Sequence, residues 1–183
     1  VGKKIKFKEK EIIIESLNDY DFSRAEITFF AAGSSIAKEW VPKAAKKTIV
    51  IDNSSYYRMQ KNVPLVVPEV NSEVLEKHNN IISNPNCSTI QMALILKPLH
   101  DEYKIKRVIV STYQAVSGAG KASEDELFNQ TKDYLSGKKI IPKNFSKQIA
   151  FNLIPHIDIF DEDGYTKEEL KMRNETKKII DND

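Results

Sequence analysis

The chain has 183 residues, of which 40% are hydrophobic, with 28 Lys and Arg against 26 Asp and Glu and a net charge of +2. This composition is ordinary for a globular protein, and the small, evenly mixed basic excess argues against a nucleic-acid-binding surface. The sequence has neither the run of about 18 apolar residues that spans a membrane nor the apolar core of a signal peptide. We therefore expect a cytoplasmic protein with no nucleic-acid or membrane partner.

The first predicted elements follow the order strand, turn, helix, strand. An apolar run over residues 26–33 ends in small residues and predicts a strand with a tight turn. Residues 34–45 then predict a helix capped by Ser34 or Ser35. A buried type of strand, Thr48–Asp52, comes next. Strands that alternate with helices indicate a parallel sheet.

The ends of these strands are the first candidates for a binding site. In open parallel sheets, ligands bind beyond the carboxyl ends of the strands. The first strand leads to Gly33, and the second is followed by Asn53 and Ser54. We therefore expect these three residues to lie close to a bound ligand.

The middle of the chain predicts further elements of the same sheet. Two prolines within residues 63–71 predict an edge segment or loop, because proline cannot donate to a central strand ladder. Residues 73–78 predict a short helix and residues 81–83 a strand. The turn 84–89 then leads into an apolar helix over residues 90–99, which its proline is expected to bend or end.

The second half of the chain predicts one strand and two helices. The β-branched run Arg107–Thr112 predicts a strand that leads into the glycine-containing loop 113–120. Helices are predicted over residues 123–134 and from Lys167 onward, and each begins with the spacing of a capping box. The two capping pairs are Ser123 with Glu126 and Thr166 with Glu169.

The single cysteine, Cys87, leaves two interpretations open. One thiol forms no internal disulfide, and the three histidines are too scattered for a zinc site. A lone cysteine is commonly a buried small hydrophobic residue. Cys87, however, lies at a strand-to-helix turn, where unpaired N–H groups and the helix dipole favour a reactive thiolate. The same N–H groups can stabilise an oxyanion when the sulfur attacks a carbonyl.

Two strings in the middle of the chain are distinctive: residues 84–91 read Asn-Pro-Asn-Cys-Ser-Thr-Ile-Gln, and residues 111–120 read Ser-Thr-Tyr-Gln-Ala-Val-Ser-Gly-Ala-Gly. Both strings resemble the bacterial aspartate-β-semialdehyde dehydrogenases. The resemblance continues on both sides, in the family's order, and covers nearly the whole chain. The other matching segments are 51–55, 58–59, 63–71, 150–158 and 164–172.

The resemblance implies an α/β fold with two parts. An incomplete Rossmann-type parallel-sheet nucleotide-binding domain would occupy residues 1–86, and an α+β catalytic and dimerisation domain residues 87–183. It also implies NADP-dependent reduction of aspartyl-β-phosphate to aspartate β-semialdehyde and phosphate, in the biosynthesis of lysine, methionine, threonine and diaminopimelate. In the family's mechanism, Cys87 attacks the acyl phosphate and the resulting thioester is reduced. Gln114 corresponds to the glutamine that positions the substrate, and Asn86 helps to shape the site.

Three residues correspond to the family's substrate-binding residues. Arg58 matches the phosphate-binding arginine, whose planar guanidinium suits bidentate recognition; a solvated surface arginine is the alternative. Glu168 and Lys171 share one helix face, and the family places them on the substrate amino group and the phosphate. The alternatives are a weak surface ion pair, or pairing of Lys171 with Glu175.

The resemblance also assigns residues to the cofactor NADP. Gly33, Asn53 and Ser54 would contact it at the strand ends, and Ser117 and Gly118 would bring the backbone close to the nicotinamide. Glycine permits such a close approach. For Ser117 and Gly118, the alternative is a plain turn with no role in binding.

The sequence departs from the family at both ends. The glycine-rich phosphate turn and the loop that reads the 2′-phosphate are missing before Val1, and the substrate-binding arginine and acid/base histidine are missing after Asp183. We therefore expect a part of a longer protein that is inactive by itself, with a parent that forms a homodimer or homotetramer. The catalytic acid/base and the preference between NADP and NAD stay open.

Three rival functions stay open as well. N-acetylglutamyl-phosphate reductases share the chemistry, but they typically carry glycine before the cysteine, where this chain has Asn86. A cysteine hydrolase would use the same thiol, although no histidine lies in a recognisable partner context. A non-catalytic interaction module is the third.

Overall fold

The computed structural model describes residues 1–180, which form two compact units. Unit 1 comprises Val1–Pro98 together with the chain from Asn174 onward, and unit 2 comprises Leu99–Arg173. Both boundaries fall inside helices, α3 (Cys87–Tyr103) and α5 (Lys167–Ile180), so each of these helices contributes to both units. Within residues 1–180, no helix is long and apolar enough to cross a membrane.

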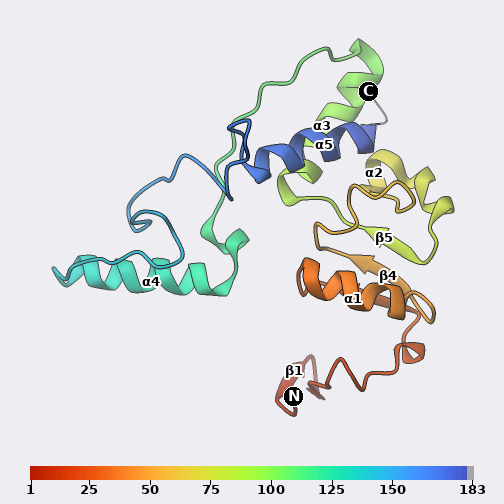
Figure 1. Cartoon of the computed structure of the whole chain (residues 1–183), viewed down its shortest axis with the longest axis horizontal. Helices are drawn as coiled ribbons and strands as arrows, with labels where there is room; N and C mark the ends of the chain where they lie inside the picture. The colour runs from red at the N-terminus through yellow and green to blue at the C-terminus, as the bar shows by residue number, and fades with distance from the viewer. Residues whose placement is uncertain (181–183) are drawn as a thin grey trace. The chain divides into compact units, whose positions relative to one another are not determined.

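Unit 1 is built on a three-stranded sheet in the order β3–β4–β5, and its strands are parallel, as the sequence predicts. Figure 1 labels β4 and β5 of this sheet. The register pairs Phe30 with Asp52 and Asp52 with Ser83, so the carboxyl ends of all three strands lie at one edge. The strands are β3 (Ile27–Phe30), β4 (Ile49–Asp52) and β5 (Ile81–Ser83).

The predicted edge segment at residues 63–71 lies beside β5. Leu65 forms an isolated parallel bridge with Ser83, and the N–H of Ser83 donates to the carbonyl of Pro64 at 2.9 Å. The segment then turns into the short helix α2 (Pro68–Asn71), which the sequence does not predict. The predicted short helix follows as the 3₁₀ helix η2 (Ser72–Lys77).

Helix α1 (Ser34–Ala44) begins at a glycine, so the predicted serine cap is wrong. Gly33 has φ of 86° in the left-handed region, and no side chain bonds the first turn of the helix. The Ser34 hydroxyl lies 3.0 Å from the Ser55 hydroxyl instead. The glycine backbone makes the change of chain direction, and the first N–H groups of α1 receive no side-chain cap.

Two hydrophobic clusters hold unit 1 together. Apolar residues of α1 recur at Ala37, Val41 and Ala44, which places them on one face of the helix, against the sheet. Burial of a side chain such as Val41 stabilises the fold by about 1.5–3 kcal/mol. The first cluster contains Phe22, Phe30, Ala37, Val41, Ala44, Val50, Tyr57 and Val63; the second contains Leu65, Val67, Val70, Ala93 and Ile179.

Unit 2 contains helix α4 (Lys121–Leu135), the 3₁₀ helix η3 (Val116–Ala119) and parts of α3 and α5. The predicted strand Arg107–Thr112 is wrong, because these residues are extended without a partner strand in the described part of the chain. Ile109 is 83% exposed. β-branched residues favour a strand only where a neighbouring strand supplies the hydrogen-bond ladder.

The two predicted capping boxes have different outcomes. The Thr166–Glu169 pair is confirmed: Thr166 N–H donates to Glu169 Oε2 at 2.7 Å, and Glu169 N–H donates to Thr166 Oγ1 at 3.2 Å. The Ser123–Glu126 pair is wrong, because α4 already begins after Gly120. The Glu126 carboxylate is occupied elsewhere, since it accepts the N–H groups of residues 143 and 144 at 2.8 and 2.6 Å.

Two further features differ from the sequence analysis. The N-terminal residues form an exposed antiparallel hairpin, β1 (Lys4–Phe7) with β2 (Lys10–Ile13), which the sequence does not predict. Helix α3 continues to Tyr103, so Pro98 does not end it.

Candidate functional site

Cys87 is the first residue of α3 and is exposed, so the interpretation as a buried hydrophobic residue is wrong. Strand β5 ends at Ser83, and three residues later the helix begins. The thiol therefore lies just beyond the carboxyl edge of the sheet, where an α/β sheet binds its ligands. Its Sγ is 4.0 Å from the Ser88 Oγ.

Asn86 caps the helix that Cys87 opens. Its Oδ1 accepts the N–H of Ser88 at 3.0 Å and that of Thr89 at 3.3 Å, while its carbonyl accepts the N–H of Ile90 at 3.0 Å. This corrects the expectation of several open N–H groups, because the side chain of Asn86 already satisfies two of them. The Cys87 N–H donates to no other residue of the described chain. It is therefore the donor left for the oxyanion that forms when the sulfur attacks a carbonyl group.

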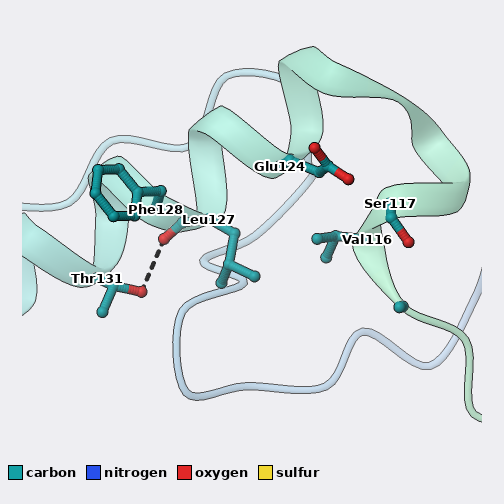
Figure 2. Close-up of a pocket in the computed structure, with 7 residues that line it drawn as sticks. Val116, Ser117, Glu124, Leu127, Phe128 and Thr131 are labelled. Atoms are coloured by element: carbon teal, nitrogen blue, oxygen red, sulfur yellow. Dashed lines mark hydrogen bonds between the residues drawn. The ribbon is translucent and has the colours of Figure 1, made fainter. Parts of the chain in front are cut away.

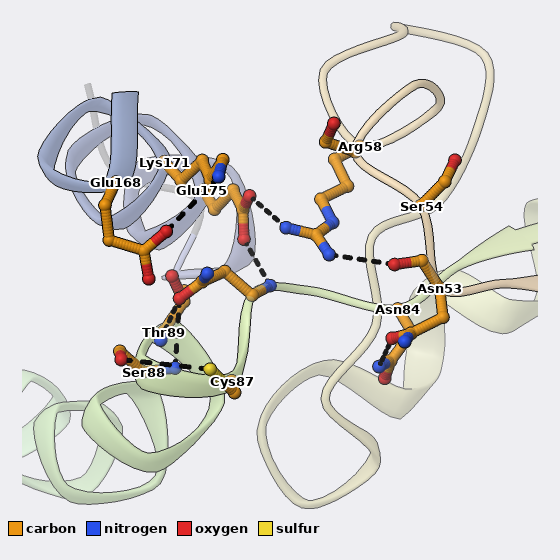
Figure 3. A network of polar contacts seen from close by, with 12 residues as sticks. Asn53, Ser54, Arg58, Asn84, Cys87, Ser88, Thr89, Glu168, Lys171 and Glu175 are labelled. Atoms are coloured by element: carbon orange, nitrogen blue, oxygen red, sulfur yellow. Dashed lines mark hydrogen bonds and ion pairs between the residues drawn. The ribbon is translucent and has the colours of Figure 1, made fainter. Parts of the chain in front are cut away.

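Arg58 is buried and paired, so its interpretation as a solvated surface residue is wrong. Its Nη1 donates to Glu175 Oε1 at 3.0 Å, and its Nη2 donates to the Asn53 carbonyl at 3.0 Å (Figure 3). Its Nε is buried and has no hydrogen-bond partner in the described chain. Glu175 thus pairs with Arg58, and not with Lys171 as the sequence analysis left open.

The residues after β4 are fixed by Asp52, which is fully buried. Asp52 accepts the Ser54 hydroxyl at 2.7 Å and the Ser54 N–H at 3.1 Å. Asn53 is exposed at the sheet edge, where its Oδ1 accepts Asn84 Nδ2 at 2.7 Å. Asn53 therefore faces solvent beyond the strand ends, whereas the hydroxyl of Ser54 points back into the turn.

Unit 2 brings the predicted residues Gln114, Glu168 and Lys171 into one network. Gln114 Nε2 donates to Glu168 Oε1 at 3.1 Å, and Lys171 Nζ donates to Glu168 Oε2 at 3.2 Å. Lys171 also donates to Asp158 Oδ2 at 3.0 Å. Burial lowers the pKa of Lys171, but the hydrogen bonds to the two carboxylates outweigh it, so this pKa is raised and the ammonium is held charged.

Asp158 is a member of this network that the sequence analysis did not single out. The residue lies at φ of 69°, a conformation that aspartate tolerates better than most residues. The only signal was its position in a segment that matches the family. Glu175 was also missed as a partner of Arg58, because 117 residues separate the two in sequence.

Ser117 and Gly118, which the sequence analysis places in a loop, lie in the 3₁₀ helix η3. Ser117 lines a pocket of about 390 Å³ between α4 and the segment 115–117 (Figure 2). The pocket is lined by Ala115, Val116, Ser117, Glu124, Leu127, Phe128 and Thr131. Residues 1–180 contain no group of His, Cys, Asp and Glu side chains that could hold a metal ion.

These features define a class: an α/β protein with a cysteine at a helix start beyond the carboxyl edge of a parallel sheet. Family comparison agrees with this class. The semialdehyde dehydrogenase NAD binding domain matches residues 1–78, and the semialdehyde dehydrogenase dimerisation domain matches residues 96–183. The chain belongs to the semialdehyde dehydrogenase family.

Individual relatives are similar over the whole chain. An aspartate-semialdehyde dehydrogenase of Aquifex aeolicus is 56% identical over 98% of this chain, and one of Rickettsia conorii is 53% identical over 100%. The crystal structure of aspartate semialdehyde dehydrogenase II from Vibrio cholerae complexed with ASA superposes with a TM-score of 0.92, at 47% identity over 99% of this chain. The chain spans 54% and 55% of the two curated relatives and 55% of that crystal structure's chain.

Proposed function

We propose that this chain is the part of an aspartate-semialdehyde dehydrogenase that carries the nucleophile. The reaction is the NADP-dependent reduction of aspartyl-β-phosphate to aspartate β-semialdehyde and phosphate, in aspartate-family amino-acid biosynthesis. The observation that supports it most is the exposed Cys87 at the first turn of α3, beyond the carboxyl edge of the sheet. The names of the relatives point the same way and do not favour an N-acetylglutamyl-phosphate reductase.

The nucleophilic step uses Cys87 and the turn around it. The thiolate sulfur bonds to the acyl carbon, the acyl C–O bond to phosphate breaks, and inorganic phosphate leaves with the bonding pair. The N–H of Cys87 is the donor available to the transient oxyanion. Asn86 holds this turn in place through Ser88 and Thr89.

Arg58, Glu168 and Lys171 are the proposed substrate-binding residues, and Gln114 is the proposed positioning residue. The guanidinium of Arg58 keeps one unpaired donor, its buried Nε, beside its two fixed bonds, and a planar guanidinium suits bidentate binding of phosphate oxygens. The raised pKa of Lys171 keeps it cationic, as an anionic substrate requires. Gln114 is bonded to Glu168, so the two side chains act as a pair.

The strand ends fit a dinucleotide. A Cβ on Gly33 would meet nothing within 4 Å, which leaves space for a ligand, and Asn53 is exposed at the same edge. Gly33, Asn53 and Ser54 would hold NADP, with Ser117 and Gly118 toward the nicotinamide. When bound, the reduced cofactor NADPH would supply the hydride for reduction of the thioester to the aldehyde, with the thiolate of Cys87 as the leaving group.

The same proposal includes three further points. The chain divides after Asn86 into a nucleotide-binding and a catalytic domain, the enzyme is cytoplasmic, and it assembles as a homodimer or homotetramer. The assembly is supported by the match of residues 96–183 to a dimerisation domain.

The test of the proposal is Cys87→Ser in the whole enzyme that contains this chain. We expect phosphate-dependent NADPH formation from aspartate semialdehyde to fall by at least about a thousandfold, since no thioester forms. Because Cys87 is exposed, the free energy of unfolding should change by less than about 0.5 kcal/mol. Retention of activity by the serine variant, or equal activity with the N-acetylglutamyl analogue, would refute the assignment.

A further inference from the structure

One buried carboxylate, Glu175, joins two residues that the proposed reaction uses. Its Oε1 accepts from Arg58 Nη1 at 3.0 Å, and its Oε2 accepts the backbone N–H of Asn86 at 2.7 Å (Figure 3). The side chain is 2% exposed. A single carboxylate thus touches both the proposed phosphate-binding arginine and the residue that immediately precedes the nucleophile.

Glu175 differs from the other glutamates of α5 in the reach of its bonds. Glu169 bonds Thr166 in its own capping box, and Glu168 bonds Lys171 within the helix and Gln114, which lies 54 residues away in sequence. The two partners of Glu175 lie 117 and 89 residues away in sequence. A carboxylate that served only to support α5 would not need either of them.

The next turn of α5 holds the same loop from its backbone side. Lys178 Nζ donates to the carbonyls of Arg58, Gln60 and Val63 at 2.7, 2.7 and 2.8 Å. Arg58 is therefore held twice by α5, through its guanidinium by Glu175 and through its carbonyl by Lys178. This double hold leaves the guanidinium little freedom relative to the turn of Asn86.

A buried carboxylate with two charge-assisted hydrogen bonds is stable only while both donors stay in place. Arg58 and the Asn86 turn are thereby tied to one another through the two oxygens of Glu175. Asn86 in turn sets the first turn of α3 through the N–H groups of Ser88 and Thr89.

We propose that Glu175 is a positioning residue of the active site, which fixes the phosphate-binding guanidinium of Arg58 relative to the turn that presents Cys87. Its link to Arg58 rests on the proposed function, whereas its hold on the turn does not. The carboxylate touches no reacting atom and acts through its two donors.

The first measurement needs no catalysis. Amide hydrogen exchange at Asn86 is followed by NMR in the whole enzyme that contains this chain, for the wild type, for Glu175→Gln and for the charge-balanced double variant Arg58→Met/Glu175→Met. Glu76→Gln, which neutralises an exposed glutamate, is the matched control. We expect exchange at Asn86 to rise about tenfold in Glu175→Gln and to stay fast in the double variant, with no change in the control. Wild-type exchange in the double variant would show that Glu175 only balances the charge of Arg58, and would overturn the proposal.

The second measurement separates positioning from stability in the whole enzyme. In Glu175→Gln the KM for phosphate should rise about tenfold and kcat should fall, because both the arginine and the thiol lose their fixed placement. A purely structural role would reduce the amount of folded enzyme and leave the KM unchanged, which would overturn the proposal. If the enzyme shows no phosphate-dependent reaction at all, the proposed function fails, and exchange at Asn86 alone then decides whether Glu175 holds the turn.

Discussion

The two units fix their site residues by different means. In unit 1, a parallel sheet and two hydrophobic clusters set the backbone, and the site lies where the strands end. In unit 2, long segments are extended, Tyr113 is 87% exposed, and polar side chains hold the backbone: Gln130 Oε1 accepts the N–H groups of residues 149 and 150 at 2.9 and 3.2 Å. Packing thus sets the sheet of unit 1, to which Glu175 and Lys178 add the hydrogen bonds that hold Arg58, whereas unit 2 relies on individual hydrogen bonds.

The sharpest way to test this contrast is to truncate one apolar side chain in each unit. Leu65→Ala in unit 1 removes a side chain that is 2% exposed and should cost about 2–5 kcal/mol of unfolding free energy. Ile109→Ala in unit 2 removes one that is 83% exposed and should cost less than about 0.5 kcal/mol. Urea unfolding followed by the fluorescence of the single tryptophan, Trp40, measures the first, and circular dichroism the second. Equal costs would contradict the contrast.

A smaller effect is expected where unit 2 depends on one carboxylate. Glu126→Gln should destabilise the segment at residues 143–144 by about 1–3 kcal/mol, because the amide offers one acceptor oxygen to two backbone N–H groups. Amide exchange at Lys143 and Asn144 measures it. As a control, Glu124→Gln on the same helix should leave this exchange unchanged, since Glu124 is exposed.

The same carboxylate gives unit 2 a pH dependence. Burial raises the pKa of Glu126, but the hydrogen bonds from residues 143 and 144 outweigh it, so the pKa is lower in the folded chain than in the unfolded one. Its contribution to stability is therefore complete above the ordinary glutamate pKa of about 4.3 and is lost as the pH falls through the lower folded value. Exchange at residues 143–144 should accelerate on acidification in the wild type, and less so in Glu126→Gln. Identical acid profiles would show that Glu126 does not hold this segment.

The smallest expected effect concerns the start of α5. Thr166→Ala removes one side of the capping box and should cost about 1 kcal/mol, measured as helix loss by circular dichroism in urea. Thr131→Ala is the matched control, because its hydroxyl bonds only the Leu127 carbonyl of its own helix at 2.8 Å. No loss in Thr166→Ala relative to the wild type would mean that α5 does not depend on this cap.

Local patterns predicted the elements whose causes are local. The strands at β3, β4 and β5 carry their own apolar runs, and the Thr166–Glu169 box is closed by residues three apart. Cys87 could be placed at a helix start because the polar turn before it and the apolar run after it are adjacent in sequence.

The failures arose where the cause lies elsewhere in the molecule. Arg107–Thr112 has strand composition, but no segment of the described chain pairs with it. Glu126 has the spacing of a cap, yet a loop 17 residues away uses its oxygens. The Arg58–Glu175 pair joins residues 117 positions apart, and no local pattern encodes such a distance.

The division of unit 1 between two distant stretches of sequence affects the order in which the chain can fold during synthesis. Residues up to Pro98 leave the ribosome well before Asn174. The contacts they need come later: Glu175 is the counter-charge of Arg58, Lys178 bonds the Arg58 carbonyl, and Ile179 belongs to the second hydrophobic cluster. Until α5 has been translated, the guanidinium of Arg58 cannot be buried beside a carboxylate, and the turn before Cys87 lacks its acceptor. The nascent chain can therefore form the parallel sheet early, but the thiol of Cys87 reaches its final setting only after nearly all of the 183 residues have been made.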